Sequence, residues 1–121
     1  MTMTLRLAFL LSLVSVLSFA GSWTGALVDA KCYTTAQQNS SHGHPASGDT
    51  KRAVRSCSPN ENTMSFSVVQ QVGMAFNLDS DGNEKAHELV LKGGKKSPFM
   101  VHVTGDVTQD SLKVHTISIA K

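Results

Sequence analysis

The sequence predicts a small, mainly β protein: a five-stranded OB-like barrel with one short helix between its third and fourth strands, preceded by a cleaved signal peptide. Three observations predict this class. Several short stretches alternate apolar and polar residues with a period of two, which is typical of strands with one buried face. Only residues 84–92 have convincing helical spacing. The resulting order of strand, long loop, two strands, helix and two strands is that of an OB-fold, and a rolled β-sandwich is the alternative.

The first twenty residues have the three parts of a secretory signal peptide. Arg6 gives the short polar start its positive charge, residues 7–19 are mostly apolar, and small residues occupy positions 18 and 20. The apolar run is shorter than the roughly 18–20 residues that span a bilayer, which disfavours the alternative of an uncleaved membrane anchor. We therefore expect cleavage after Ala20, a secreted or periplasmic location, and one mature domain over residues 21–121.

The mature chain is expected to be nearly neutral. Cleavage after Ala20 removes only Arg6 from the charged residues, which leaves ten basic and nine acidic side chains. The longest basic run is Lys95-Lys96. Since nucleic-acid-binding surfaces are strongly basic, no nucleic acid partner is expected, and no membrane span remains after cleavage. A small ligand, a metal ion and another envelope protein stay open as partners.

The first strand is expected at residues 22–29, where Trp23 and Leu27 share one face. Residues 33–62 are then more polar, and the stretches 37–45 and 58–62 contain almost no apolar side chains to bury, so they predict a long loop with one helical turn near 50–56. Loops of this length inside compact domains are usually functional or poorly ordered. The loop also holds most of the candidate site residues.

Cys32 and Cys57 are the only cysteines, and both lie in the mature chain. In an oxidising compartment an even count of two allows one intramolecular disulfide, which would fix the base of the long loop. Closing a loop of this length stabilises a fold by about 3 kcal/mol. The alternative is a pair of reduced thiols that serve redox chemistry or bind a metal. The structural disulfide is the interpretation we favour.

Two runs of period two follow at residues 64–70 and 72–78, and they predict either an antiparallel pair or one long bent strand with a kink near Gly73. Residues 79–83 are dense in turn-forming side chains. The helix at 84–92 begins with an acidic residue and ends with a basic one before a Gly-Gly stop, as the helix dipole favours.

The last two strands are expected at residues 99–103 and 112–119, with a turn at 107–110 between them. The apolar positions of the last strand change phase near its middle. Such a change occurs where one extra residue enters a strand. It therefore predicts a β-bulge near His115 and Thr116.

Several motifs resemble those of a known family. The mature part opens with Trp-Thr-Gly at 23–25, followed by Asp29 and the two cysteines, and it continues with G-x-x-F-x-L at 73–78 and V-x-V-T-G at 101–105. Together these motifs are similar to a family of small secreted bacterial proteins of unknown function, common in acidobacteria and other soil bacteria. The resemblance covers about two thirds of the mature chain and implies an exported OB-like fold, with no catalytic residues to carry over. A longer loop and the lack of further cysteines near the second one leave the transfer of a redox or metal role open.

His42 and His44 are the candidate metal ligands. Two imidazoles two residues apart on one loop can face the same ion, and imidazole suits Cu²⁺, Ni²⁺ or Zn²⁺. With Cys32 and Cys57 they would complete a Cys₂His₂ set, but their spacing matches no zinc module and both thiols would have to stay reduced. The alternative is a solvated polar loop, and no other cofactor is expected. Residues 79–83 resemble the start of a calcium loop but lack its later ligands, so a helix-capping turn is the simpler interpretation.

No catalytic residues are predicted. The sequence contains neither G-x-S-x-G nor C-x-x-C. His102 and His115 lie on expected strands near Asp106 and Asp110, where histidines are usually surface or satisfied residues. Most aromatic side chains fall on inward-facing positions, and Tyr33 is the one expected to be exposed. The sequence thus predicts a non-enzymatic binding or envelope-associated module, with a metal-binding protein and a small secreted enzyme as the alternatives.

Overall fold

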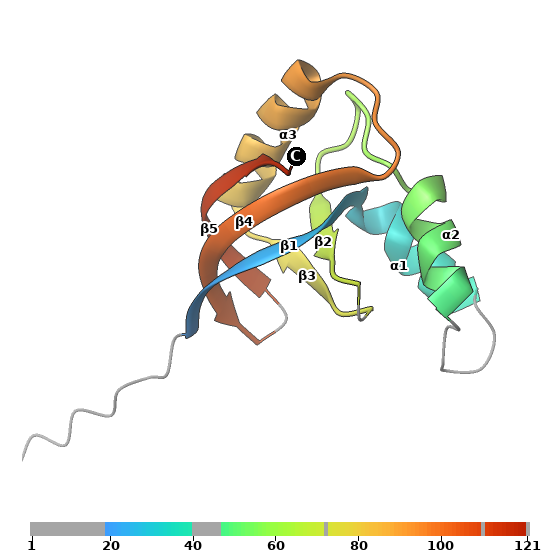
Figure 1. Cartoon of the computed structure of the whole chain (residues 1–121), viewed down its shortest axis with the longest axis horizontal. Coiled ribbons are helices and arrows are strands. Elements are labelled where there is room, and N and C mark those ends of the chain that lie inside the picture. The colour runs from blue at the N-terminus through green and yellow to red at the C-terminus, as the bar shows by residue number, and fades with distance from the viewer. Residues whose placement is uncertain (1–18, 40–46, 72, 110, 121) are drawn as a thin grey trace, which may run out of the picture.

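The protein is a closed five-stranded β-barrel with the strand order β1-β2-β3-β5-β4, in a computed structural model that describes residues 19–39, 47–71, 73–109 and 111–120 (Figure 1). The strands are β1 (Phe19–Asp29), β2 (Phe66–Val69), β3 (Ala75–Leu78), β4 (Phe99–Thr108) and β5 (Ser111–Ile119). The helices are α1 (Ala30–Asn39), α2 (Ser47–Ser56) and α3 (Ser80–Gly93). Neighbouring strands are antiparallel except β3 and β5, which run parallel. This topology, with a helix between the third and fourth strands, confirms the predicted OB-like barrel.

Alternating apolar side chains fill the barrel, because every second residue of a strand points to the same face. Burial of this apolar surface is the main favourable term in folding. Helix α3 packs against the barrel through Ala86 and Val90, which belong to the same core. The largest fully buried apolar residues of the core come from four strands: Leu27, Phe66, Val68, Phe99, Val101, Val103 and Leu112.

A second, smaller apolar cluster lies outside the barrel wall, where α1 and α2 cover β1 and β2. Val28 and Val69 point away from the barrel interior and meet Tyr33 and Cys57 there. Tyr33 is only 3% exposed, so the prediction that it would be exposed is wrong. The helix that carries Tyr33 turns its ring onto the outer face of the sheet, and no strand periodicity could have indicated this.

The prediction of a long loop over residues 33–62 is wrong, since α1 and α2 occupy much of its described part. Asp29 starts α1: its side chain accepts the backbone N–H of Cys32 at 3.1 Å, as a helix N-cap does. Helix α2 includes the residues where one helical turn was predicted and extends it to ten residues. Short polar helices are marginal alone, and here the second cluster and a disulfide hold them in place.

The turn at residues 79–83 caps α3, as predicted. The Asp79 carboxylate accepts the backbone N–H of Gly82 at 2.9 Å and stands at the N-cap position. The helix begins at Ser80, earlier than its apolar periodicity indicated, because a capped first turn needs no buried side chains. At the other end Gly94 has φ 70°, which confirms the predicted glycine stop.

A β-bulge interrupts the pairing of β4 with β5. Thr104 pairs with Thr116, whereas the next residue, Gly105, pairs with Val114. His115 is therefore the extra residue of the bulge, which confirms the prediction made from the change of apolar phase. Gly105 lies so close to the backbone carbonyl of the strand opposite that a side chain there would collide with it.

The strand boundaries differ from the prediction at both ends of the sheet. β1 begins at Phe19, so it includes the last residues before the expected cleavage point, and residues 1–18 lie outside the described part of the chain. β4 runs to Thr108 and does not end at 104–105, which shortens the predicted turn at 107–110. β2 and β3 form the antiparallel pair that was one of two predicted arrangements, with Gly73 at φ 85° between them.

Candidate functional site

A groove of about 550 Å³ lies between α2 and the outer face of the barrel, and we call it the α2 groove. Strands β1, β2 and β4 form its floor and α2 forms one wall. The turn after β2 and the segment before β4 contribute the remaining residues. The groove is lined by Ala26, Thr50, Lys51, Val54, Arg55, Val69, Gln70, Gln71, Pro98 and Met100.

The floor of the α2 groove is a row of apolar side chains across three strands. Ala26 on β1 pairs with Val69 on β2 on one side and with Met100 on β4 on the other. Their neighbours Leu27, Val68 and Val101 belong to the barrel core, so by strand alternation the floor residues face outward. Each side chain of the floor stands on a hydrogen-bonded strand of a closed barrel.

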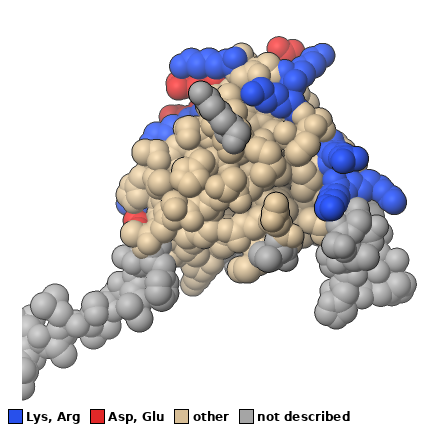
Figure 2. Space-filling view, viewed as in Figure 1, with Lys and Arg blue, Asp and Glu red and all other residues tan. Residues whose placement is uncertain are grey.

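The wall of the groove is positively charged. Lys51 and Arg55 are four residues apart on α2, so they lie on one helix face, with Val54 between them. Lys51 and Arg55 are exposed, and no aspartate or glutamate is among the described residues that line the groove. Figure 2 shows one group of basic side chains over α2, at the right of the view, and among the described residues no acidic side chain lies within this group. Among the described residues the one ion pair joins His115 and Asp106, away from this helix.

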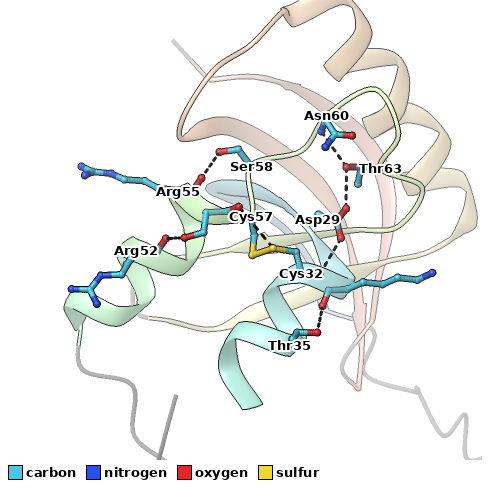
Figure 3. The surroundings of a disulfide bond; sticks show 11 residues. Asp29, Cys32, Thr35, Arg52, Arg55, Cys57, Ser58, Asn60 and Thr63 are labelled. Atoms are coloured by element: carbon cyan, nitrogen blue, oxygen red, sulfur yellow. Dashed lines mark hydrogen bonds between the residues drawn. A yellow bond between two sulfur atoms is a disulfide. The ribbon is translucent and has the colours of Figure 1, made fainter. Parts of the chain in front are cut away.

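A disulfide joins Cys32 on α1 to Cys57 just after α2, the helix that forms the groove wall (Figure 3). The two Cα atoms are 5.4 Å apart, and Cys57 directly follows α2. The backbone carbonyl of Cys57 also accepts the N–H of Asp29 at 2.8 Å, which ties it to the end of β1. The predicted disulfide is thus confirmed, and it fixes the position of α2 relative to the groove floor.

Two smaller hollows lie elsewhere on the described surface. One, of about 520 Å³, lies between α1 and the strands β2 and β3, and Lys31 is its single charged residue. The other, of about 380 Å³, lies beside the first half of α3 and is lined in part by Glu84, His87 and Glu88. The described residues nevertheless contain no group of three or more histidine, cysteine, aspartate or glutamate side chains placed to hold a metal ion.

His42 and His44, the predicted metal ligands, lie outside the described residues. Cys32 and Cys57 cannot join them in a Cys₂His₂ site while they form a disulfide, because zinc binds the thiolate. That part of the metal-site hypothesis is therefore wrong. Metal binding by the two histidines alone stays a prediction.

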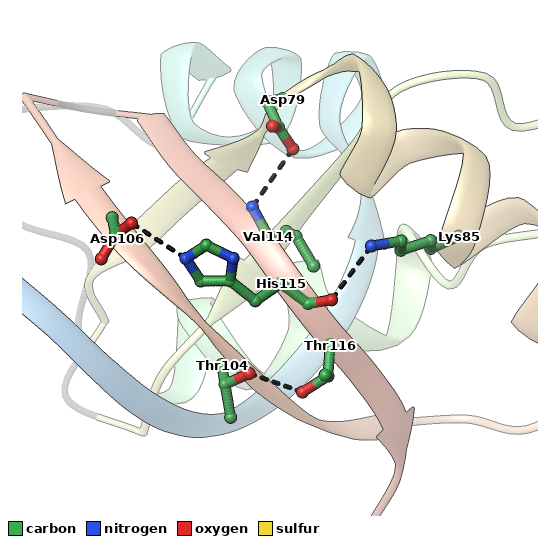
Figure 4. Close-up of polar contacts among 7 residues, drawn as sticks. All are labelled: Asp79, Lys85, Thr104, Asp106, Val114, His115 and Thr116. Carbon is green, nitrogen blue, oxygen red and sulfur yellow. Dashed lines mark hydrogen bonds and ion pairs between the residues drawn. The ribbon is translucent and has the colours of Figure 1, made fainter.

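The strand histidines are exposed and hydrogen-bonded, as predicted. His102 Nδ1 lies 2.9 Å from the hydroxyl of Thr24, and His115 Nε2 lies 2.9 Å from Asp106 Oδ2 (Figure 4). A Ser-His-Asp type of site needs a hydroxyl and a carboxylate on the same imidazole. Here, within the described chain, one histidine has the hydroxyl and the other has the carboxylate.

Sequence reasoning missed the α2 groove. Lys51 and Arg55 fall in a polar stretch that was assigned to a loop, and Ala26, Val69 and Met100 come from three separate strands. The available signal was faint: Val54 lies between two cations at helical spacing.

No family model, no curated protein and no solved structure gave a significant match to this chain. The resemblance to small secreted bacterial proteins therefore stays a prediction. Among the described residues, no helix combines the length and the apolar character needed to cross a membrane.

Proposed function

We propose that this protein is an exported, non-enzymatic binding module that holds a small ligand in the α2 groove. The observation that carries the proposal is the groove itself, in which an apolar floor on a closed barrel faces a polar wall held by a disulfide. Ligand sites are typically concave, mostly apolar and equipped with a few polar groups that orient the ligand. The volume of about 550 Å³ falls in the usual range for small-molecule sites.

Export is supported by two features. The apolar N-terminal run with small residues at 18 and 20 has the pattern of a signal peptide, and disulfides such as Cys32–Cys57 persist in oxidising compartments. Mass spectrometry of protein from an exporting host tests this directly. A mass that corresponds to a chain starting at Gly21, without the two thiol hydrogens, supports export and the disulfide. A mass that includes residues 1–20 contradicts cleavage.

Binding in the groove is tested with N-phenylnaphthylamine, an uncharged dye that becomes fluorescent in apolar sites. The variant Met100→Trp fills the groove from its floor, so it should weaken dye binding by about tenfold. The matched control is Met64→Trp, because Met64 is 76% exposed and lies outside the groove. Thermal unfolding of both variants verifies that each is folded. If the dye binds both variants as tightly as the original protein, the groove is not its site and the proposed function is wrong.

A further inference from the structure

We infer that the ligand of the α2 groove is an organic anion, a molecule with an apolar body and one acidic head group. The inference rests on the proposed function and names the class of ligand for the same site. It follows from the charge of the wall, the spacing of its cations and the apolar character of the floor.

The described residues of the groove carry two positive charges and no counter-charge. Lys51 and Arg55 are both among its lining residues, and the described part of the lining includes no carboxylate. Neither cation forms an ion pair within the described part of the chain. Two adjacent like charges repel each other, so an anion between them removes an unfavourable interaction and adds two favourable ones.

The spacing of the cations suits a single head group. Side chains four residues apart on a helix have Cβ atoms about 5–6 Å apart, so both can reach one carboxylate or phosphate. The guanidinium of Arg55 offers parallel N–H donors that fit either head group in a bidentate way, and the ammonium of Lys51 adds a point charge. Gln70 and Gln71 add amide groups at the rim of the groove.

The floor selects an anion with an apolar portion over a bare inorganic ion. Ala26, Val69 and Met100 offer no hydrogen bonds from their side chains, but they remove apolar ligand surface from water. An inorganic anion would use only the wall. An amphiphilic anion uses the wall and the floor together, with its head near α2 and its body along the strands.

A pair of dyes that differ in one group separates this inference from the proposed function. Anilinonaphthalene sulfonate is N-phenylnaphthylamine with an added acidic group. We expect the sulfonate to bind about tenfold more tightly than the uncharged dye at low salt, and we expect added salt to weaken only the sulfonate. Equal affinity of the two dyes, with both weakened by Met100→Trp, would leave the proposed function in place and overturn the anionic ligand.

Substitutions on α2 locate the charge effect. Arg55→Gln should weaken binding of the sulfonate about tenfold more than it weakens binding of the uncharged dye. The matched control is Arg52→Gln on the same exposed helix, because Arg52 is not a lining residue. If both variants weaken the sulfonate equally, the dye responds to the overall charge of the helix and the inference is wrong.

Competition then identifies the head group. Decanoate and decyl phosphate should displace the bound sulfonate, and decanol, which has the same chain without a charge, should do so at least about tenfold more weakly. Stronger displacement by decanoate indicates a carboxylate ligand, and stronger displacement by decyl phosphate indicates a phosphate ligand. Displacement by decanol at the same concentration as by decanoate would contradict the inference, because the cations would then contribute nothing.

Discussion

Thr63 donates a hydrogen bond of 3.1 Å from its hydroxyl to Asp29 Oδ2, across 34 residues of chain (Figure 3). The other carboxylate oxygen of Asp29 accepts the N–H of Cys32 at the start of α1. Thr63 is only 2% exposed, and its hydroxyl oxygen also accepts the backbone N–H of Asn60. One carboxylate thus joins the end of β1, the start of α1 and the segment that leads into β2.

We predict that Asp29→Ala lowers the free energy of unfolding by about 2 kcal/mol, because it removes a helix cap and leaves a buried hydroxyl without its acceptor. Thr63→Val keeps the volume but removes the donor, and it should cost about 1 kcal/mol. Urea denaturation of both variants and of the double variant measures their coupling, which we expect to be on the order of 1 kcal/mol. Strict additivity of the two effects would show that the bond contributes nothing. Thr35→Val, which removes an exposed bond within α1, is the control.

Removal of the disulfide should lower stability by about 3 kcal/mol, since it releases a constraint across a sequence separation of 25 residues. The variant carrying Cys32→Ala and Cys57→Ala tests this in urea without the chemistry of free thiols. The original protein measured in reductant should lose a similar amount. Because the bridge holds α2 at the groove, both forms should also bind the uncharged dye more weakly. Unchanged stability in both forms would mean that apolar contacts and hydrogen bonds hold α1 and α2 without help from the bridge.

Gly105→Ala should destabilise the barrel by about 1–3 kcal/mol, because the added methyl group would meet the carbonyl of Lys113 across the bulge. Backbone atoms of a sheet cannot rotate aside as a flexible side chain can. Thr108→Ala is an exposed substitution on the same strand and should change stability by less than about 0.5 kcal/mol. Thermal or urea unfolding compares the two. Equal effects would show that the bulge opens readily.

The barrel could be predicted from the sequence because its strands alternate and its irregularities leave a trace in that alternation. The change of apolar phase before Ile117 indicated the bulge at His115, and turn-forming residues indicated the cap of α3. Each of these signals is local: it depends on residues close together in the chain. Few folds other than an OB-like barrel have this order of strands and helix.

The two helices before β2 and the groove could not be predicted in this way. Helices α1 and α2 have few apolar residues. They depend on the disulfide, the hydrogen bond from Thr63 to Asp29 and the burial of Tyr33, which involve residues distant in sequence. The groove floor depends on the register that places Ala26 between two other strands. A register is a property of paired strands, and one strand's sequence does not contain it.

The last prediction concerns Tyr33, the only tyrosine in the sequence. Burial raises the pKa of its phenol above the ordinary value of 10.0, and a hydrogen bond with Gln37 acts in the opposite direction without cancelling the effect of burial. A raised pKa means that the folded protein holds the phenol proton more tightly than the unfolded chain does. The stability that the protonated Tyr33 contributes is therefore fully present below the pKa of the phenol in the unfolded chain. It is lost as the pH rises through the pKa of the phenol in the folded protein.

Alkaline unfolding measures this effect, with Tyr33→Phe as the variant that keeps the ring and removes the proton. Lysines also titrate in this range, so the quantity to follow is the difference in the free energy of unfolding between the original protein and Tyr33→Phe. We expect the original protein to lose stability relative to Tyr33→Phe when the pH rises from about 9 to about 11. Tyrosinate absorbance should report Tyr33 alone and show a midpoint above 10.0 in the folded protein. A midpoint at the ordinary value would mean that water reaches the ring, and that α1 does not cover the outer face of the barrel closely.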